Sequence, residues 1–225
     1  GDKVLTGNSC GGKYEKCIEP LQYLYSDRTL SAEIIPGKSV IGIAVDPENR
    51  LAVAIDYIMT TGWGGYGIDI PTLENTPSSG AGIYVRGERD SYLIRDGKAN
   101  TAKILAYGRS NGISYPAAET AYNYQPGSCS SSSWCGRGNW YLPSNWQVFP
   151  YFDNRATIHL MLKAINKMPD DWWYTRNDFY TVTSNEINAK ESGFIYINTG
   201  GMAHGGKNLT EPDNLQTLVL PYITY

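Results

Sequence analysis

The sequence has little charge and very little histidine. Lys and Arg number 19 and Asp and Glu number 22 among 225 residues, which gives a formal net charge of −3. This balance does not support binding to nucleic acid or to another polyanion through bulk charge. The two histidines, His159 and His204, stand in no recognisable Ser or Cys motif and beside no cluster of metal ligands. We therefore expect no enzyme activity, no bound metal and no cofactor.

Long apolar runs are also missing. No stretch is long enough to cross a bilayer as a helix, and the polar residues after Gly1 do not form a signal peptide. We interpret this start as one from which an export signal has been removed, and the sequence leaves a lipid anchor upstream open.

Cysteine is scarce and falls in two close pairs, Cys10 with Cys17 and Cys129 with Cys135. Both pairs lie in segments rich in Gly and Ser. An even number of cysteines in such segments favours disulfides in an oxidising compartment, and neither pair has the spacing of zinc ligands. The three connectivities that four cysteines allow remain open.

Phenylalanine is rare, with 4 residues, whereas tyrosine numbers 18 and tryptophan 6. Tyr and Trp combine an apolar body with a polar tip, so they suit half-hydrated surfaces that contact sugars or proteins. The high β propensity of Tyr gives a second explanation, namely the Tyr-rich strands of a secreted β protein. The 24 Gly and 12 Pro favour a loop-rich fold with β structure over a helical bundle.

The central stretch, residues 138–146, joins a short apolar strand to a helix. Pro143 cannot donate to a strand ladder and favours an extended Leu142, and Ser144 suits the N-cap of the helix that follows. We expect the large apolar side chains of this corner to lie in the core: Trp140, Leu142, Trp146 and Phe149.

Periodicity predicts the other elements. Apolar runs at 40–45 and 51–55 flank a polar turn and predict a hairpin. Further strands are expected within 21–25, 82–86, 172–174, 192–198 and 215–225, where Pro221 indicates an edge or a bulge. Helices are expected from Asn100 or Thr101 to Gly108, from Pro116 onward, and around 158–165, with His159 off the apolar stripe and partly exposed. Residues 69–82 and 204–214 are expected to be loops.

Four blocks in this order are similar to a known family. They are the hairpin, Asp96-Gly97-Lys98-Ala99-Asn100-Thr101 with Ile104-Leu105, Tyr115-Pro116-Ala117-Ala118, and Trp140-Tyr141-Leu142-Pro143-Ser144. Trp173-Tyr174-Thr175 and Leu218-Val219-Leu220-Pro221 follow in the family's order. The chain resembles the Fibrobacter succinogenes major paralogous domain family, which is related to the C-terminal domain of the Legionella collagen-like adhesin.

The resemblance implies an α+β fold of the C-type-lectin-like kind, with a mixed, mostly antiparallel sheet flanked by two main helices and with long loops. Residues 40–225 would form this domain, and residues 1–39 would be an extension with a disulfide loop packed on it. Members of the family are exported, often lipid-anchored bacterial proteins whose attributed functions are binding and adhesion.

Aromatic residues beside Gly, Ser or Asp are expected to reach the surface. With two polar neighbours they make up the candidate ligand-binding set: Trp63, Tyr66, Trp134, Trp172, Arg176 and Asp178. The alternative is that these aromatic side chains only cover loops. Glu211-Pro212-Asp213-Asn214 superficially resembles the motif of calcium lectins, but no Trp-Asn-Asp run follows it, so we predict no calcium site.

Two functions follow as hypotheses. The first is an exported module on the outer-membrane surface, in the periplasm or outside the cell, which binds a glycan or a surface protein through its loop face. The second is a structural or assembly subunit of a surface complex without a small ligand. An enzyme of unknown reaction ranks third, since no catalytic constellation is visible in the sequence.

Overall fold

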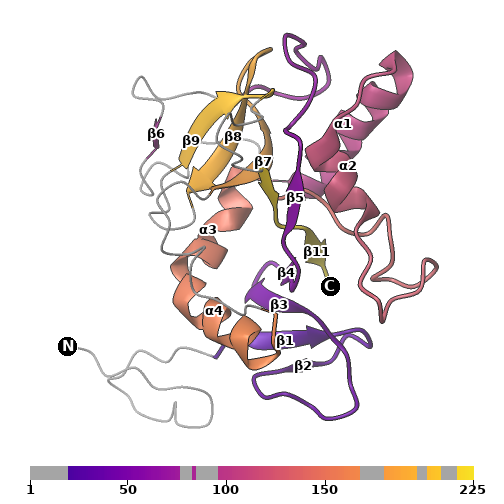
Figure 1. The fold of residues 1–225 in the computed structure, drawn as a ribbon, viewed down its shortest axis with the longest axis vertical. Helices are drawn as coiled ribbons and strands as arrows, with labels where there is room; N and C mark the ends of the chain where they lie inside the picture. The colour runs from indigo at the N-terminus through magenta and orange to yellow at the C-terminus, as the bar shows by residue number, and fades with distance from the viewer. Residues whose placement is uncertain (1–19, 77–82, 85–95, 168–179, 197–201, 209–216) are drawn as a thin grey trace.

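The computed structural model describes residues 20–76, 83–84, 96–167, 180–196, 202–208 and 217–225. In these residues the chain forms two β-sheets and four α-helices (Figure 1). The predicted α+β class is confirmed. The expectation of one sheet with two main helices is wrong for these residues, and the C-type-lectin-like fold stays a prediction.

The first sheet has five strands in the order β11-β4-β3-β1-β2, and all its pairs are antiparallel. Its strands are β1 (Gln22–Tyr25), β2 (Leu30–Ser31), β3 (Val40–Asp46), β4 (Leu51–Ala54) and β11 (Tyr222–Thr224). The β3–β4 pair is the predicted hairpin, which is confirmed. The first described strand of the expected extension, β1, pairs directly with β3, and the boundary at residue 40 stays a prediction.

The second sheet has six strands in the order β5-β10-β7-β8-β9-β6, and only β10 and β7 run parallel. Its strands are β5 (Ile58–Thr60), β6 (Ile83–Tyr84), β7 (Tyr180–Glu186), β8 (Glu191–Tyr196), β9 (Met202–Gly206) and β10 (Thr217–Val219). The strands predicted within 82–86 and 192–198 are confirmed as β6 and β8. No pattern in the sequence had predicted β7, and β9 lies where we expected a polar loop to begin.

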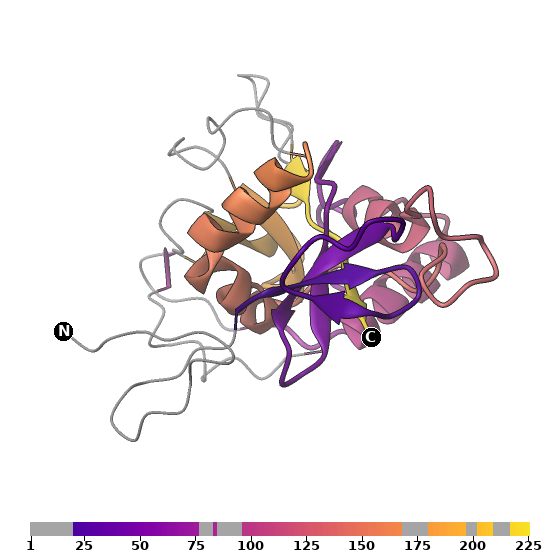
Figure 2. The same cartoon turned by 90° about the horizontal axis from the view of Figure 1, so that it is seen from below.

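The helices are α1 (Gly97–Asn111), α2 (Pro116–Asn123), α3 (Asn145–Asp153) and α4 (Arg155–Ala164). Figures 1 and 2 place α1 and α2 on one side of the molecule and α3 and α4 on the other. The prediction for α1 is corrected at both ends. Asp96 caps its start by accepting a hydrogen bond from the amide of Ala99, and the helix continues past Gly108 to Gly112, whose φ of 65° suits a glycine C-cap.

The six-stranded sheet buries both faces. On one face, Val182 and Phe194 lie in an apolar cluster with Ile104 of α1 and with α2 residues. On the other face, Ile195 packs with Val148 and Phe149 of α3. Neighbouring residues of β8 thus point to opposite faces, as in any strand, and each face meets a different helix.

The five-stranded sheet is also covered twice. One face contributes Tyr23, Ile43 and Val53 to a cluster with residues of α3 and α4. The opposite face contributes Leu24 and Ala52 to a cluster that contains both half-cystines of the 129–135 disulfide.

The central stretch joins these layers, as predicted. Trp140, Tyr141 and Leu142 are each about 1% exposed or less and enter three different apolar clusters. Tyr141 pairs with Tyr222 of the five-stranded sheet. Two residues later, the carbonyl of Pro143 accepts a hydrogen bond at 2.8 Å from the amide of Ser184 in the six-stranded sheet. The corner therefore passes from one sheet to the other within three residues.

Ser144 caps α3, as predicted. Its hydroxyl accepts from the amide of Gln147, and the Gln147 side chain accepts from the Ser144 amide, which completes a capping box. The same Gln147 oxygen accepts from the amide of Gly97, so the cap also ties α3 to the start of α1. Trp146 is only half-buried, in contrast to the expectation that it would be a core anchor.

Two further expectations need correction. The closing strand is not continuous, because the chain changes sheets at Leu220-Pro221, between β10 and β11. The segment after residue 69 is not simply an exposed loop, because Ile70, Leu73 and Thr76 are all buried.

Candidate ligand-binding surface

The predicted site residues differ in their exposure to solvent. Tyr66 is 50% exposed, as expected, whereas Trp63 is 2% exposed, so the expected surface position of Trp63 is wrong. Trp134 is half-buried. The remaining predicted residues, Trp172, Arg176, Asp178, Cys10 and Cys17, lie outside the described residues. Their proposed roles stay predictions.

Tyr66 lies in an aromatic loop, residues 61–70, that hydrogen bonds hold against the residues beneath it. The indole Nε1 of Trp63 donates to the carbonyl of Thr183 in β7 at 2.8 Å. The amides of Trp63 and Gly64 both donate to the carbonyl of Lys207, at 3.1 and 3.0 Å, and Gly67 donates to Ala189 at 2.8 Å. The buried tryptophan is thus the anchor of the loop, and Tyr66 is the aromatic residue that the loop presents to solvent.

A buried ion pair lies beneath this loop. The Lys207 Nζ lies 2.6 Å from Oε2 of Glu186, and both side chains have 0% exposure. Nζ also donates to the carbonyl of Ile68 at 2.7 Å. Burial raises the pKa of the Glu186 carboxyl to about 7, and burial lowers the pKa of Lys207. The sequence pattern does not predict that these two residues form a pair, because they are 21 positions apart.

A cleft of about 460 Å³ lies where the end of α1 meets the start of α2. The side chains that can offer contacts there are Arg109, Ser114, Glu119, Tyr122 and Asn123. Arg109 and Asn123 are exposed, and Tyr122 is 38% exposed. The cleft therefore combines a guanidinium, a carboxylate, an amide and a phenol ring, which suits a polar ligand that has an apolar face.

Local hydrogen bonds fix one wall of the cleft. The Glu119 carboxylate accepts from the Ser114 hydroxyl at 3.2 Å and from the Tyr115 amide at 3.1 Å. These bonds hold the turn before α2 in place, and Pro116 occupies the first turn of that helix, as predicted. The wall is therefore formed before any ligand binds.

The cleft adjoins the aromatic loop through Tyr115. The Trp63 and Tyr115 rings meet edge to face, with centroids 5.6 Å apart. A Cβ atom placed on Gly65 would lie 2.4 Å from Cε1 of Tyr115, and Gly65 has a φ of 66°. Only glycine lets the loop approach the ring this closely, so the loop with Tyr66 packs directly against a residue that lines the cleft.

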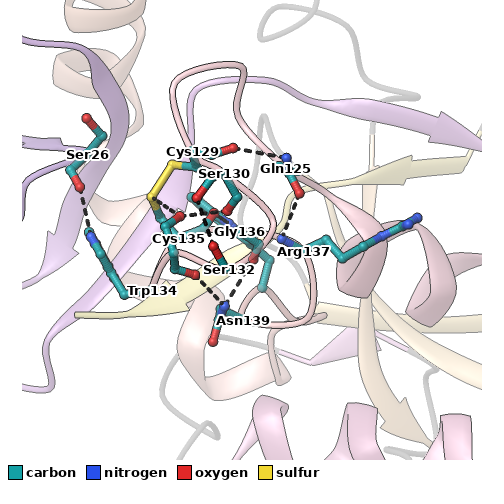
Figure 3. Close-up of a disulfide and its surroundings, with 12 residues drawn as sticks. Ser26, Gln125, Cys129, Ser130, Ser132, Trp134, Cys135, Gly136, Arg137 and Asn139 are labelled. Carbon is teal, nitrogen blue, oxygen red and sulfur yellow. Dashed lines mark hydrogen bonds between the residues drawn. A yellow bond between two sulfur atoms is a disulfide. The ribbon is translucent and has the colours of Figure 1, made fainter.

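The disulfide between Cys129 and Cys135 closes a Ser-rich loop, as the sequence predicted (Figure 3). The Trp134 indole donates to the carbonyl of Ser26 at 2.8 Å, and the guanidinium carbon of Arg28 lies 4.7 Å from the ring centroid. Trp134 therefore attaches the loop to the turn after β1, and this contact uses a large part of its surface. A ligand role for Trp134 stays a prediction.

The described residues show no cluster of metal ligands. Within them, no group of three or more His, Cys, Asp or Glu side chains is placed to hold a metal ion. His159 is buried in α4, which corrects the expected partial exposure. The other histidine, His204, pairs through Nδ1 with the carboxylate of Glu191 on the neighbouring strand.

Reasoning from the sequence missed the cleft because its polar residues look like an ordinary solvated helix surface. Arg109 lies beyond Gly108, where the sequence predicts the end of the helix. The signal that could have located the cleft is Gly112, whose left-handed backbone ends α1 and turns the chain back into α2.

Comparison with known proteins gives a fold but no family. No protein-family model matches the chain, and no curated protein matches it. A solved fimbrial protein from Bacteroides ovatus ATCC 8483 is similar in structure, with a TM-score of 0.58 and 15% sequence identity over 96% of this chain. The chain spans about half, 51%, of that protein. The match shows a shared α+β fold, and the resemblance to the Fibrobacter family stays a prediction.

None of the described helices is long and apolar enough to cross a membrane.

Proposed function

We propose that this chain is an exported bacterial surface module that binds a glycan in the cleft between α1 and α2. The observation that carries the proposal is the cleft itself, a preformed hollow of about 460 Å³ lined by polar side chains and the exposed ring of Tyr122. Sugar rings present hydroxyl groups at their edges and C–H groups on their faces. Such a ligand matches a guanidinium, an amide and a carboxylate arranged around an aromatic ring.

The surrounding surface supports the same proposal. Tyr66 stands on the adjacent loop at 50% exposure and can extend contact beyond the cleft to a second sugar unit. The shared fold with a fimbrial protein favours a place at the bacterial surface, and the disulfide favours an oxidising compartment.

A glycan array probed with the intact chain tests the proposal, followed by titration calorimetry with the best glycan. Arg109→Ala should weaken binding about tenfold or more, which corresponds to about 1.4 kcal/mol. The variant should keep the wild-type unfolding transition, because Arg109 is exposed. Leu160→Ala is the matched control, since this residue is 66% exposed on α4, away from the cleft. Equal binding by Arg109→Ala and wild type would exclude the cleft as the site.

The shared fold with a fimbrial protein favours a second function, an assembly subunit without a small ligand. Analytical ultracentrifugation separates the two functions. Under the assembly hypothesis the chain associates with copies of itself or with a surface partner and binds no glycan on the array. Under the binding hypothesis it binds glycan as a monomer with the stated dependence on Arg109.

A further inference from the structure

The buried Lys207 and Glu186 pair is held in place by several contacts. Three groups fix the Lys207 nitrogen: Oε2 of Glu186 at 2.6 Å, the carbonyl of Ile68 at 2.7 Å, and the Trp63 ring, whose centroid is 4.9 Å away. Neither side chain of the pair has any exposure to solvent. The amine and the carboxyl group are thus held in contact and shielded from solvent, and such fixed proximity favours a reaction between them.

Burial also shifts both groups towards their neutral, reactive forms, whereas the charge of each partner favours the charged form of the other. Burial disfavours the charged form of both groups, which raises the pKa of Glu186 and lowers the pKa of Lys207. The ion pair becomes a neutral amine beside a neutral carboxylic acid when one proton moves from nitrogen to oxygen. A neutral, desolvated lysine is a nucleophile, and a protonated carboxyl group can lose its hydroxyl as water.

A second carboxyl group stands next to the first. The Asp69 side chain lies close enough to the carboxyl group of Glu186 to raise its pKa. Asp69 is exposed, so a carboxyl group in contact with solvent stands beside the covered pair. Asp69 can therefore supply and remove protons during an addition and elimination at Glu186.

We propose that Lys207 and Glu186 condense to form an intramolecular isopeptide bond once the chain has folded. The Lys207 Nζ adds to Cδ of Glu186, and the C–OH bond of the carboxyl group breaks. One hydrogen of the amine and the hydroxyl group leave together as one molecule of water. No atom is oxidised or reduced, and no further reactant is needed.

The bond would cross the six-stranded sheet. Glu186 is the last residue of β7, and Lys207 directly follows β9, with β8 between these two strands. The amide would therefore close residues 186–207, which include β8 and β9, into a covalent ring that starts at the end of β7. The aromatic loop would be fixed to the same point, because its amides donate to the Lys207 carbonyl. This inference does not depend on the proposed glycan site.

The mass of the intact wild-type chain tests the inference directly. After full reduction and denaturation, the chain should be lighter than its sequence mass by one water, about 18 Da. Reduction removes the contribution of the disulfides. A chain with its full sequence mass would overturn the proposal and leave the pair as an ion pair.

Peptide mapping locates the bond. Trypsin cleaves after Arg176, Lys190 and an unmodified Lys207. A bond at Lys207 blocks the last cleavage, so residues 177–190 should appear joined to residues 191–225 in a single branched species. A loss of water located in any other peptide would contradict the assignment.

Two exposed ion pairs serve as internal controls in the same digest. Lys38 with Asp27 and Lys167 with Asp56 have N–O distances of 2.7 and 3.0 Å but are about two-fifths or more exposed. Their peptides should remain unlinked. A similar loss of water at these pairs would show that sample handling, and not burial, had produced the bond, and would overturn the proposal.

Variants then assign the roles. Lys207→Arg keeps the positive charge but should show the full mass, and Asp69→Asn should lower the fraction of linked chains several-fold in a folded protein. Wild-type linkage in Asp69→Asn would overturn the part assigned to Asp69. The wild-type mass decides the bond itself even if Lys207→Arg fails to fold.

Discussion

Each sheet contains a strand that is buried along its whole length, but by different means. In the five-stranded sheet, every residue of β4 is buried and apolar, with the sequence Leu-Ala-Val-Ala. In the six-stranded sheet, every residue of β7 is also buried, but five of the seven are polar or charged in the sequence Tyr-Thr-Val-Thr-Ser-Asn-Glu. Full burial of a strand therefore does not require an apolar sequence.

Hydrogen bonds replace apolar contacts around β7. The Asn185 side chain donates to the hydroxyl of Thr76 at 2.7 Å and accepts from the amide of Asn145 at 2.8 Å. The Asn100 side chain donates to the hydroxyl of Ser184 at 3.1 Å. These bonds reach β7 from α1, from α3 and from the segment after the aromatic loop. A buried polar network of this kind is stable only where its members find partners.

The largest expected effect is in the apolar sheet. Ile43→Ala should lower the free energy of unfolding by roughly 2–5 kcal/mol, because the side chain is fully buried in the cluster under α4 and its loss leaves a cavity. Urea denaturation followed by circular dichroism measures the change. Ile34→Ala is the control, because Ile34 is 50% exposed and should change stability by no more than about 0.5 kcal/mol. Similar values for both variants would refute this account of the apolar sheet.

Two exchanges between Thr and Val, which have similar shapes, should have an intermediate effect on the free energy of unfolding. Thr183→Val removes the hydroxyl that donates to the Asn145 side chain, and the loss should cost about 1–3 kcal/mol. Val53→Thr places a hydroxyl in the apolar cluster of the other sheet and should also cost about 1–3 kcal/mol. The same denaturation assay compares them. If Thr183→Val were neutral, the network around β7 would contribute no stability, and the contrast between the sheets would be lost.

The smallest effect is expected at the junction of the sheets. Ser144→Ala removes the N-cap of α3 and should cost about 1 kcal/mol, as is typical of such caps. Thermal unfolding measures the shift. A loss of stability as large as that in Ile43→Ala would mean that the cap holds the two sheets together. The two sheets would then not be independent of each other.

The same contrast explains how much of the fold the sequence predicts. The β3–β4 hairpin, the start of α2 and the buried corner at Trp140 and Leu142 follow from apolar periodicity and from the chemistry of Pro and Ser. β7 could not be predicted in this way, because the partners that bury Thr183 and Asn185 come from residues 38 and 109 positions away. The sequence therefore does not predict a second sheet, although it predicts the β8 strand.

The candidate site was harder to predict. Tyr66 was assigned to the surface correctly because glycines flank it, but the same argument was wrong for Trp63, whose indole finds a partner in β7. Neighbouring glycines cannot tell a loop that projects into solvent from one that packs against a ring. The cleft depends on how α1 and α2 meet, and the buried pair depends on two strands that the sequence pattern did not reveal.

The position of β10 and β11 has a consequence for the order of folding. β10 lies between β5 and β7, and β11 completes the edge beside β4, so both sheets receive a strand from residues 217–224. During synthesis these residues appear after all the other described strands. Until then β5 and β7 have no strand between them. The residues that pair β5 with β10 are more than 150 positions apart in the sequence. Such distant pairing is slow because a long loop must close first, so we expect native structure in both sheets to form late and together, after the final strands are available.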